Sequence, residues 1–185
     1  MKPLSNLVNR YANKLIWVFI ITYTCLFCYL CFLKYRSFGY YDWDFASDVT
    51  VLWNTIHGKI LYYPFLDEVV FGAHLYLVIF LIIPIYAVFQ HPVTLLFLQT
   101  LFLGLGAYPL YLIAKLKTDK AIALAVGLAY LLYPPLGHIN IFETHFDSYV
   151  IFFLLSAFYY FEKEKFNKFL CFLLLALSCK ENIGP

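Results

Sequence analysis

Long uncharged apolar segments constrain the fold of this chain more than any other feature of its sequence. Leu15–Leu33 and Val93–Ala114 contain no charged residue, and they are 19 and 22 residues long. A helix of about 20 residues is what the hydrocarbon core of a bilayer requires. In lipid, backbone N–H and C=O groups must be paired within their own segment, so both segments are predicted to be helices. The sequence therefore predicts an all-α polytopic membrane protein whose main partner is the lipid bilayer.

The composition agrees with this class. Hydrophobic residues make up 63% of the chain and charged residues 13%, whereas about 25% of a soluble domain is charged. A net charge of +2 without a basic patch argues against nucleic-acid binding. All five cysteines lie inside apolar segments, so no disulfide framework is expected. The Cys25-x-x-Cys28-x-x-Cys31 spacing is interpreted as packing rather than metal binding.

The basic residues predict how the segments cross the membrane. The shorter apolar segments are Gly72–Gln90, Ala121–Gly137, Ser148–Phe161 and Phe166–Cys179. If all six segments cross and residues 1–14 are cytoplasmic, nine of the 13 basic residues fall outside, against the positive-inside rule. If Gly72–Gln90 is re-entrant or interfacial, nine fall inside. We therefore expect a multi-pass protein of the inner (plasma) membrane with five spans and one re-entrant helix; six spans are the alternative.

Two acid-rich loops then fall on the outer side, within a single transmembrane domain expected over residues 15–185. They are residues 34–71 and 138–147. In the first loop, Ser47–Leu61 is predicted to form an amphipathic helix in the membrane interface. Asp44 or Ser47 is expected to cap its start, and Gly58 lies near its end. Its apolar face is predicted to carry Val49, Leu52, Trp53, Ile56 and Ile60.

Acidic residues of these loops are candidates for acid–base chemistry. Asp42 and Asp44 lie beside the low dielectric of the membrane, which raises the pKa of a carboxyl toward that of a useful base. The alternative is a purely structural role, in which Asp44 caps a helix and the side chain of Asp42 is exposed to water. Glu143, His145 and Asp147 would point to one side of an extended loop, where they could bind a divalent cation or share a proton. Here the alternative is a polar loop with a capping acid.

Other polar residues complete the set of candidates. His74 would lie near the outer mouth of the re-entrant segment, and Lys180 follows the last apolar run, where it could meet a lipid phosphate. An interfacial histidine and a snorkelling lysine are the structural alternatives. Asp48 is expected to face water, so its substitution is predicted to be mild.

Many short elements in order resemble a family of predicted prokaryotic membrane proteins, catalogued as domain of unknown function 2079. The resemblance covers residues from about 40 to the end of the chain. The matching elements are Tyr41-Asp42, Leu52-Trp53-Asn54-Thr55, His57-Gly58, Leu61-Tyr62, Gly72-Ala-His74, Pro84-Ile-Tyr86, Leu98-Gln99, Gly106-Ala-Tyr-Pro109-Leu-Tyr111, Ala129-Tyr130-Leu-Leu-Tyr133-Pro134, Asn140-Ile-Phe142-Glu143-Thr-His145 and Lys180-Glu181-Asn182.

That family is grouped by similarity with the C-type (GT-C-like) integral membrane glycosyltransferases, which use lipid-linked sugar donors. The resemblance implies that Asp42 or Asp44 is the catalytic base and Glu143 the second acid. Where the family usually has Asp, this chain has Glu143, and Asp147 lies near but not at the usual trailing acid. The family's proteins are longer, so the resemblance implies a chain that is incomplete at its C-terminus.

The resemblance therefore implies a GT-C-like N-terminal module that transfers a sugar from a polyprenyl-phosphate-linked donor to an outer-face acceptor. The rival class is a non-catalytic membrane module, either lipid-binding or transport-associated, or an inactive truncated remnant. The candidate roles are catalysis for Asp42, Asp44 and Glu143, substrate binding for Trp53, Asn54, His74 and Lys180, and binding of a divalent metal cation for His145 and Asp147.

Overall fold

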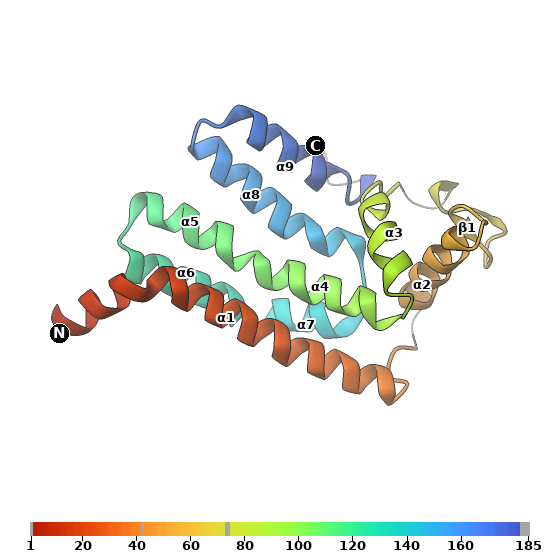
Figure 1. The fold of residues 1–185 in the computed structure, drawn as a ribbon, viewed down its shortest axis with the longest axis horizontal. Helices are drawn as coiled ribbons and strands as arrows, with labels where there is room; N and C mark the ends of the chain where they lie inside the picture. The colour runs from red at the N-terminus through yellow and green to blue at the C-terminus, as the bar shows by residue number, and fades with distance from the viewer. Residues whose placement is uncertain (1, 42, 73–74, 182–185) are drawn as a thin grey trace.

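The protein is all-α apart from one very short hairpin, as seen in a computed structural model that describes residues 2–41, 43–72 and 75–181, with side chains from residue 8 onward (Figure 1). Its helices are α1 (Lys2–Arg36), α2 (Trp43–Ile56), α3 (Ile79–Val88), α4 (Val93–Leu105), α5 (Ala107–Lys117), α6 (Lys120–Leu131), α7 (Pro134–Phe142), α8 (Val150–Glu162) and α9 (Phe166–Leu177). The short elements are strands β1 (Tyr62–Tyr63) and β2 (Glu68–Val69) and the 3-10 turns η1 (Val70–Gly72) and η2 (Phe146–Tyr149).

Two helical stretches are long and apolar enough to cross a membrane. They are Val8–Arg36 in α1 and Val93–Lys117 across α4 and α5, which confirms the two uncharged segments as helices. A third candidate is the pair α6 and α7, which is bent by 42°. The bend falls where Pro134 begins α7, because proline lacks the N–H that a continuing helix needs.

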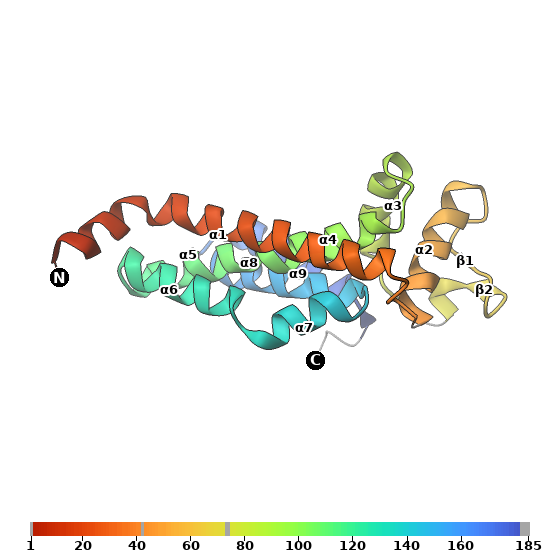
Figure 2. The same cartoon turned by 90° about the horizontal axis from the view of Figure 1, so that it is seen from below.

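The prediction of five spans is not confirmed by the described helices. α8 has 13 residues, which is about 20 Å at 1.5 Å per residue, and α9 has 12. Both fall short of the roughly 30 Å of a hydrocarbon core; they pack together as an antiparallel pair (Figure 1). α3, which contains Pro84, has only 10 residues and runs across the direction of α1 and α4 (Figures 1 and 2). Among the described residues of Gly72–Gln90, no helix is therefore long enough to cross.

Two buried apolar clusters hold the helices together. In the first, Ile16 and Ile20 of α1 pack with Leu103, Tyr111 and Leu124 of α4, α5 and α6. The second joins α2, α3, α4 and α8 through Leu52, Ile79, Leu95 and Phe153, among others. α1 and α4 approach closely at Gly104, where an added Cβ would lie 2.9 Å from Thr24 Oγ1. The second cluster is the one that anchors α2 to the bundle.

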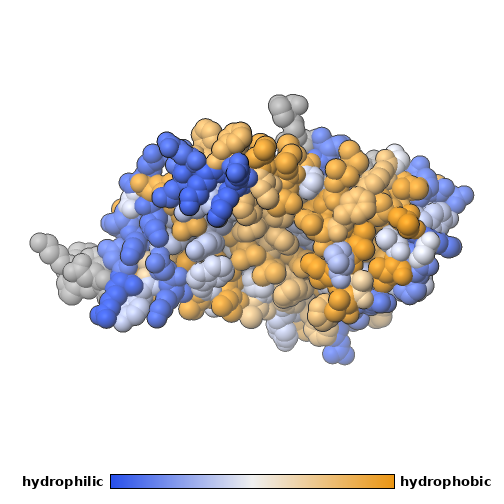
Figure 3. All heavy atoms as spheres, turned by 45° about the horizontal axis from the view of Figure 1, so that its top comes forward, coloured by the Kyte–Doolittle hydropathy of each residue, from blue (hydrophilic) through white to orange (hydrophobic). Residues whose placement is uncertain are grey.

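The N-terminal part of α1 lies at the same end of the bundle as the α5–α6 and α8–α9 connections (Figure 1), and eight of the 13 basic residues lie in these parts of the chain or in the helix turns next to them. They are Arg10, Lys14, Lys115, Lys117, Lys120, Lys163, Lys165 and Lys168. Asn9 Oδ1 accepts a hydrogen bond from the Ala121 N–H at 2.9 Å. Lys117 Nζ lies 3.6 Å from Glu162 Oε2. Between this end and the opposite one, hydrophobic side chains cover the middle of the face drawn in Figure 3. This segregation of charge is what a protein embedded in a bilayer requires.

The opposite end carries α2 and the hairpin (Figure 2). β1 and β2 pair antiparallel, with Tyr62 opposite Val69, and this hairpin was not predicted. The predicted Ser47–Leu61 helix instead runs from Trp43 to Ile56. Gly58, in the left-handed conformation at φ 91°, follows its end as expected.

The predicted caps of this helix are wrong. The hydroxyl of Ser47 donates to the Trp43 carbonyl oxygen at 2.6 Å instead of capping the first turn. The carboxylate of Asp44 is directed to His145. The first turn is capped from outside the helix, by Glu143.

The segregation of charge predicts the orientation of the chain in the membrane. In a variant whose five cysteines are replaced, Ala46→Cys and Asp67→Cys should react with an impermeant thiol reagent added outside the cell. Thr118→Cys and Glu164→Cys should not, because the positive-inside rule predicts that their end of the bundle is cytoplasmic. All four positions are exposed. Labelling of position 118 or 164 with protection of position 46 would reverse the orientation.

Candidate functional site

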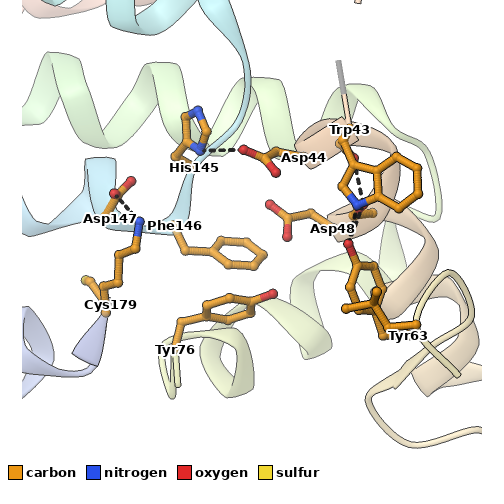
Figure 4. A pocket seen from close by; sticks show the side chains of 12 residues that line it. Trp43, Asp44, Asp48, Tyr63, Tyr76, His145, Phe146, Asp147 and Cys179 are labelled. Carbon is orange, nitrogen blue, oxygen red and sulfur yellow. Dashed lines mark hydrogen bonds and ion pairs between the residues drawn. The ribbon is translucent and has the colours of Figure 1, made fainter. Parts of the chain in front are cut away.

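A cavity of about 300 Å³ lies where the first half of α2 meets η2, the hairpin and the residues that follow α9 (Figure 4). It brings together segments that are more than 130 residues apart in the sequence. Its walls combine acids, aromatic rings and one lysine, a polar composition for a chain this apolar. The lining residues are Trp43, Asp44, Ser47, Asp48, Tyr63, Leu66, Tyr76, His145, Phe146, Asp147, Cys179 and Lys180.

Two charge pairs flank the cavity. Asp44 Oδ2, from the first turn of α2, lies 3.5 Å from His145 Nδ1, and Asp147 Oδ2 lies 3.1 Å from Lys180 Nζ. The chain that carries Lys180 after α9 is also bonded to the chain before α3, where the Val78 N–H donates to the Ser178 carbonyl oxygen at 2.9 Å. Four of the predicted site residues therefore share one cavity.

Asp48 is the residue that sequence reasoning missed. Its side chain lies on the buried face of α2 with Phe45 and Leu52, is only 8% exposed, and points into the cavity (Figure 4). Burial raises the pKa of Asp48 well above its ordinary value, and the nearby carboxylates, first that of Asp44, raise it further. The expectation that Asp48 faces water is wrong. Asp48 and Leu52 are four residues apart, a spacing that places both on the same face of a helix. This could have predicted that Asp48 is buried with Leu52, but an acid on an apolar face was considered improbable.

Glu143 holds the site together from behind. Its carboxylate Oε2 accepts a hydrogen bond from the Phe45 N–H at 3.0 Å, and the residue is 2% exposed. An anion at a helix N-terminus satisfies an unpaired N–H and interacts favourably with the helix dipole. Glu143 is not among the described residues that line the cavity. It fixes the turn that carries Asp44 and Asp48.

Gln99, in the middle of α4, clamps the loop that carries Glu143 and His145. Its amide nitrogen donates to the Glu143 carbonyl oxygen at 2.7 Å, and its amide oxygen accepts from the His145 N–H at 2.7 Å. Gln99 is 1% exposed. Beside it, Thr100 donates to the side chain of Asn140 at 2.8 Å, so two adjacent residues of α4 fix the end of α7. Sequence reasoning gave Gln99 no role, although a polar amide within an uncharged span was a signal.

Trp53 and Asn54 lie away from the cavity. Trp53 is 49% exposed and stacks on His57 with ring centroids 3.9 Å apart. Asn54 donates to the Tyr62 carbonyl oxygen at 3.3 Å, which joins α2 to β1. Asp42 and His74 lie outside the described residues. Of the three described residues that were predicted to bind substrate, Trp53, Asn54 and Lys180, it is Lys180 that lines the cavity.

His145 and Asp147 were predicted to bind a divalent cation, but the part of the chain that the structure describes does not place them in a set of metal ligands. There, no group of three or more His, Cys, Asp or Glu side chains is arranged to hold a metal ion. His145 faces Asp44 and Asp147 faces Lys180. A lysine ammonium beside Asp147 competes with a cation for the same oxygen atoms, so we derive no metal-dependent step.

Comparisons with known proteins identify a family without a described activity. A family model described as "Predicted membrane protein (DUF2079)" matches residues 34–185. No curated protein and no solved structure matches the chain. The match includes every described residue that lines the cavity.

Removing the Gln99 clamp should destabilise the loop that carries His145. Gln99→Leu leaves the Glu143 carbonyl and the His145 N–H without their partner, at a cost of about 1–3 kcal/mol for each unsatisfied group. Gln90→Leu is the matched control, because Gln90 is exposed and its described hydrogen bond is a local one, to the Ala87 carbonyl oxygen. Denaturation of the purified protein in detergent measures both variants. Equal unfolding midpoints for the two variants would contradict the clamp.

Asp48 should make stability depend on pH. Because its pKa is raised in the folded state, its contribution is fully present below the ordinary carboxyl pKa of about 3.9 and is lost as pH rises through the raised pKa. Asp48→Asn should therefore gain Tm relative to wild type as pH increases from about 4 to about 9. Asp67→Asn, on the exposed hairpin turn, is the control and should show no such trend. A constant difference in Tm across this range would rule out a titrating Asp48.

Proposed function

The chain belongs to the DUF2079 family of predicted membrane proteins, and from this premise we propose that it acts as a membrane glycosyltransferase-like protein. In this proposal it transfers a sugar from a polyprenyl-phosphate-linked donor to an acceptor at the outer face of the plasma membrane. The observation that carries the proposal is the cavity in which the Asp44–His145 and Asp147–Lys180 pairs face each other.

The Asp44–His145 pair is suited to accept a proton. A general base must reach the proton that it removes, and its partner must keep it oriented. The side chain of Asp44 is 58% exposed and that of His145 32% exposed, so a ligand in the cavity can reach both. A carboxylate beside an imidazole can pass a proton along the pair. We assign the role of general base to Asp44, assisted by His145; the sequence had suggested Asp42 or Asp44 for this role.

The proposed step moves one sugar without an oxidant or reductant. The acceptor hydroxyl oxygen attacks the anomeric carbon, and the bond from that carbon to the phosphate oxygen breaks. The polyprenyl phosphate leaves with the electron pair, and the hydroxyl proton passes to Asp44. The ammonium of Lys180, held 3.1 Å from Asp147, is the described cation of the cavity that could stabilise the leaving phosphate.

The position of the cavity in the bundle supports a lipid-linked donor. Its walls come from α2, η2, the hairpin and the residues after α9, and α2 and the hairpin lie at the end of the bundle away from the α5–α6 and α8–α9 connections (Figure 1). In this proposal that end meets the outer surface of the membrane. A donor with a polyprenyl tail in the bilayer presents its phosphate at this depth. Glu143 takes a positioning role here, because its carboxylate caps α2.

The proposal predicts which acids matter for turnover. Full-length protein in lipid nanodiscs is incubated with radiolabelled polyprenyl-phosphate sugars, and release of the sugar is counted. Asp44→Asn and His145→Gln should each lower turnover by about 10²–10⁴-fold, the range for loss of a general base. Asp42→Asn tests the other first-loop acid, and Glu143→Gln should lower turnover together with the unfolding midpoint.

Asp67→Asn is the control for this experiment. Asp67 accepts a hydrogen bond from the Tyr62 hydroxyl at 2.7 Å on the hairpin and does not line the cavity. Turnover that survives in Asp44→Asn and His145→Gln, at normal protein level, would refute the acid–base assignment. Binding of the donor without any sugar release by the wild type would favour a non-catalytic lipid-binding module instead.

A further inference from the structure

We propose that this cavity binds a cationic amine, with the carboxylate of Asp48 as its counter-ion. The proposal rests on the proposed function only in taking the cavity as the substrate site. The ligand would be a primary ammonium group carried by an amino sugar or by a lipid headgroup. The carrier of the amine differs between these two sources, but the recognition chemistry is the same.

One of the carboxylates that line the cavity has no described partner of opposite charge. Three carboxylates line it, and two of them have described partners, His145 for Asp44 and Lys180 for Asp147. Within the described residues, the Asp48 carboxylate has neither a hydrogen bond nor an ion pair, although its side chain is more than nine-tenths buried. A buried charge without a partner is costly, so this group either stays protonated or awaits a cation.

The walls beside Asp48 favour an organic cation. The aromatic rings of Trp43, Tyr63, Tyr76 and Phe146 line the same cavity (Figure 4). Ammonium groups are attracted to the faces of aromatic rings within about 6 Å. An ammonium also has three N–H donors, which a carboxylate and nearby tyrosine hydroxyls can accept. About 300 Å³ is at the small end of ligand cavities and suits one sugar ring or one headgroup.

A metal ion and a neutral polyol fit these observations less well. The described side chains provide no set of three metal ligands, and an ammonium needs no such set. A neutral hydroxyl forms no ion pair with the Asp48 carboxylate, so it would not favour the ionised form of this buried group. The titratable groups that surround Asp48 are Asp44 of α2, Tyr63 of β1, Tyr76 before α3, Glu143 and His145 after α7, Asp147 and Tyr149 of η2, and Cys179 and Lys180 after α9.

Binding of the amine should release a proton. Burial and the other carboxylates raise the pKa of Asp48, so the empty cavity holds it protonated to a higher pH than an ordinary carboxyl. An ammonium favours the ionised form. Affinity should therefore increase as pH rises toward the raised pKa of Asp48, as long as the amine itself stays protonated. Neutral isosteres should show neither effect.

The test is calorimetric titration of the full chain in nanodiscs. Glucosamine and ethanolamine are the probes, and glucose and ethylene glycol, in which a hydroxyl replaces the ammonium, are their uncharged counterparts. Each amine that serves as ligand should bind about tenfold or more tightly than its counterpart, as expected for a charge-assisted hydrogen bond. Titration in two buffers of different ionisation enthalpy should show release of about one proton per amine bound. Preference for glucosamine or for ethanolamine identifies the source of the amine.

Two variants make the result specific to Asp48. Asp48→Asn keeps the shape of the side chain and should abolish the preference for the amine, and Asp67→Asn should retain it. Equal affinity for amine and counterpart in both pairs, or an amine preference that survives in Asp48→Asn, would overturn the inference. If Asp48→Asn does not fold, the proton count of the wild type decides, and a count near zero refutes the counter-ion.

The outcome also separates this inference from the proposed function. If neither amine binds more tightly than its uncharged counterpart while sugar release still depends on Asp44, the amine inference fails and the transferase proposal stands. Amine binding without any sugar release would do the reverse. Binding and turnover are therefore measured on the same preparations.

Discussion

The geometry of the cavity depends on one buried loop, residues 143–148, that is bonded on both sides. On one side Gln99 of α4 holds the backbone of Glu143 and His145. On the other side the Glu143 carboxylate caps α2 through the Phe45 N–H. These hydrogen bonds are mostly shielded from water, so each unsatisfied partner would cost about 1–3 kcal/mol. A candidate membrane span is thus connected rigidly to the helix that carries Asp44 and Asp48.

Predictions from the sequence succeeded where one physical requirement dominates. A bilayer requires long uncharged helices, so α1 and the α4–α5 stretch were predictable, and so was the all-α class. The lengths of α8 and α9 were not, because apolar composition does not show where a helix ends. The hairpin escaped detection because two-residue strands leave no alternation to detect.

The same reasoning explains what was found and missed at the site. Asp44, His145, Asp147 and Lys180 were predicted because charges are rare in this chain, and all four line the cavity. The role of Glu143 could not be predicted, since its capping bond joins residues 98 positions apart. Asp48 was missed because solvation is the usual fate of an acid, and only the packing of α2 shows that its face is buried. The positions of charged residues in the sequence identify candidate site residues, but the role of each depends on its long-range contacts in the fold.

The capping bond has a consequence for biosynthesis. Helix α2 leaves the ribosome long before Glu143 is made, so its first turn must wait for a partner that is synthesised later. Until α4 and α7 are inserted, the turn that carries Asp44 and Asp48 has its backbone N–H groups bonded to water. The cavity is therefore among the last parts of the described chain to form, and nascent chains that stop before residue 143 would present its acids unassembled at the membrane surface.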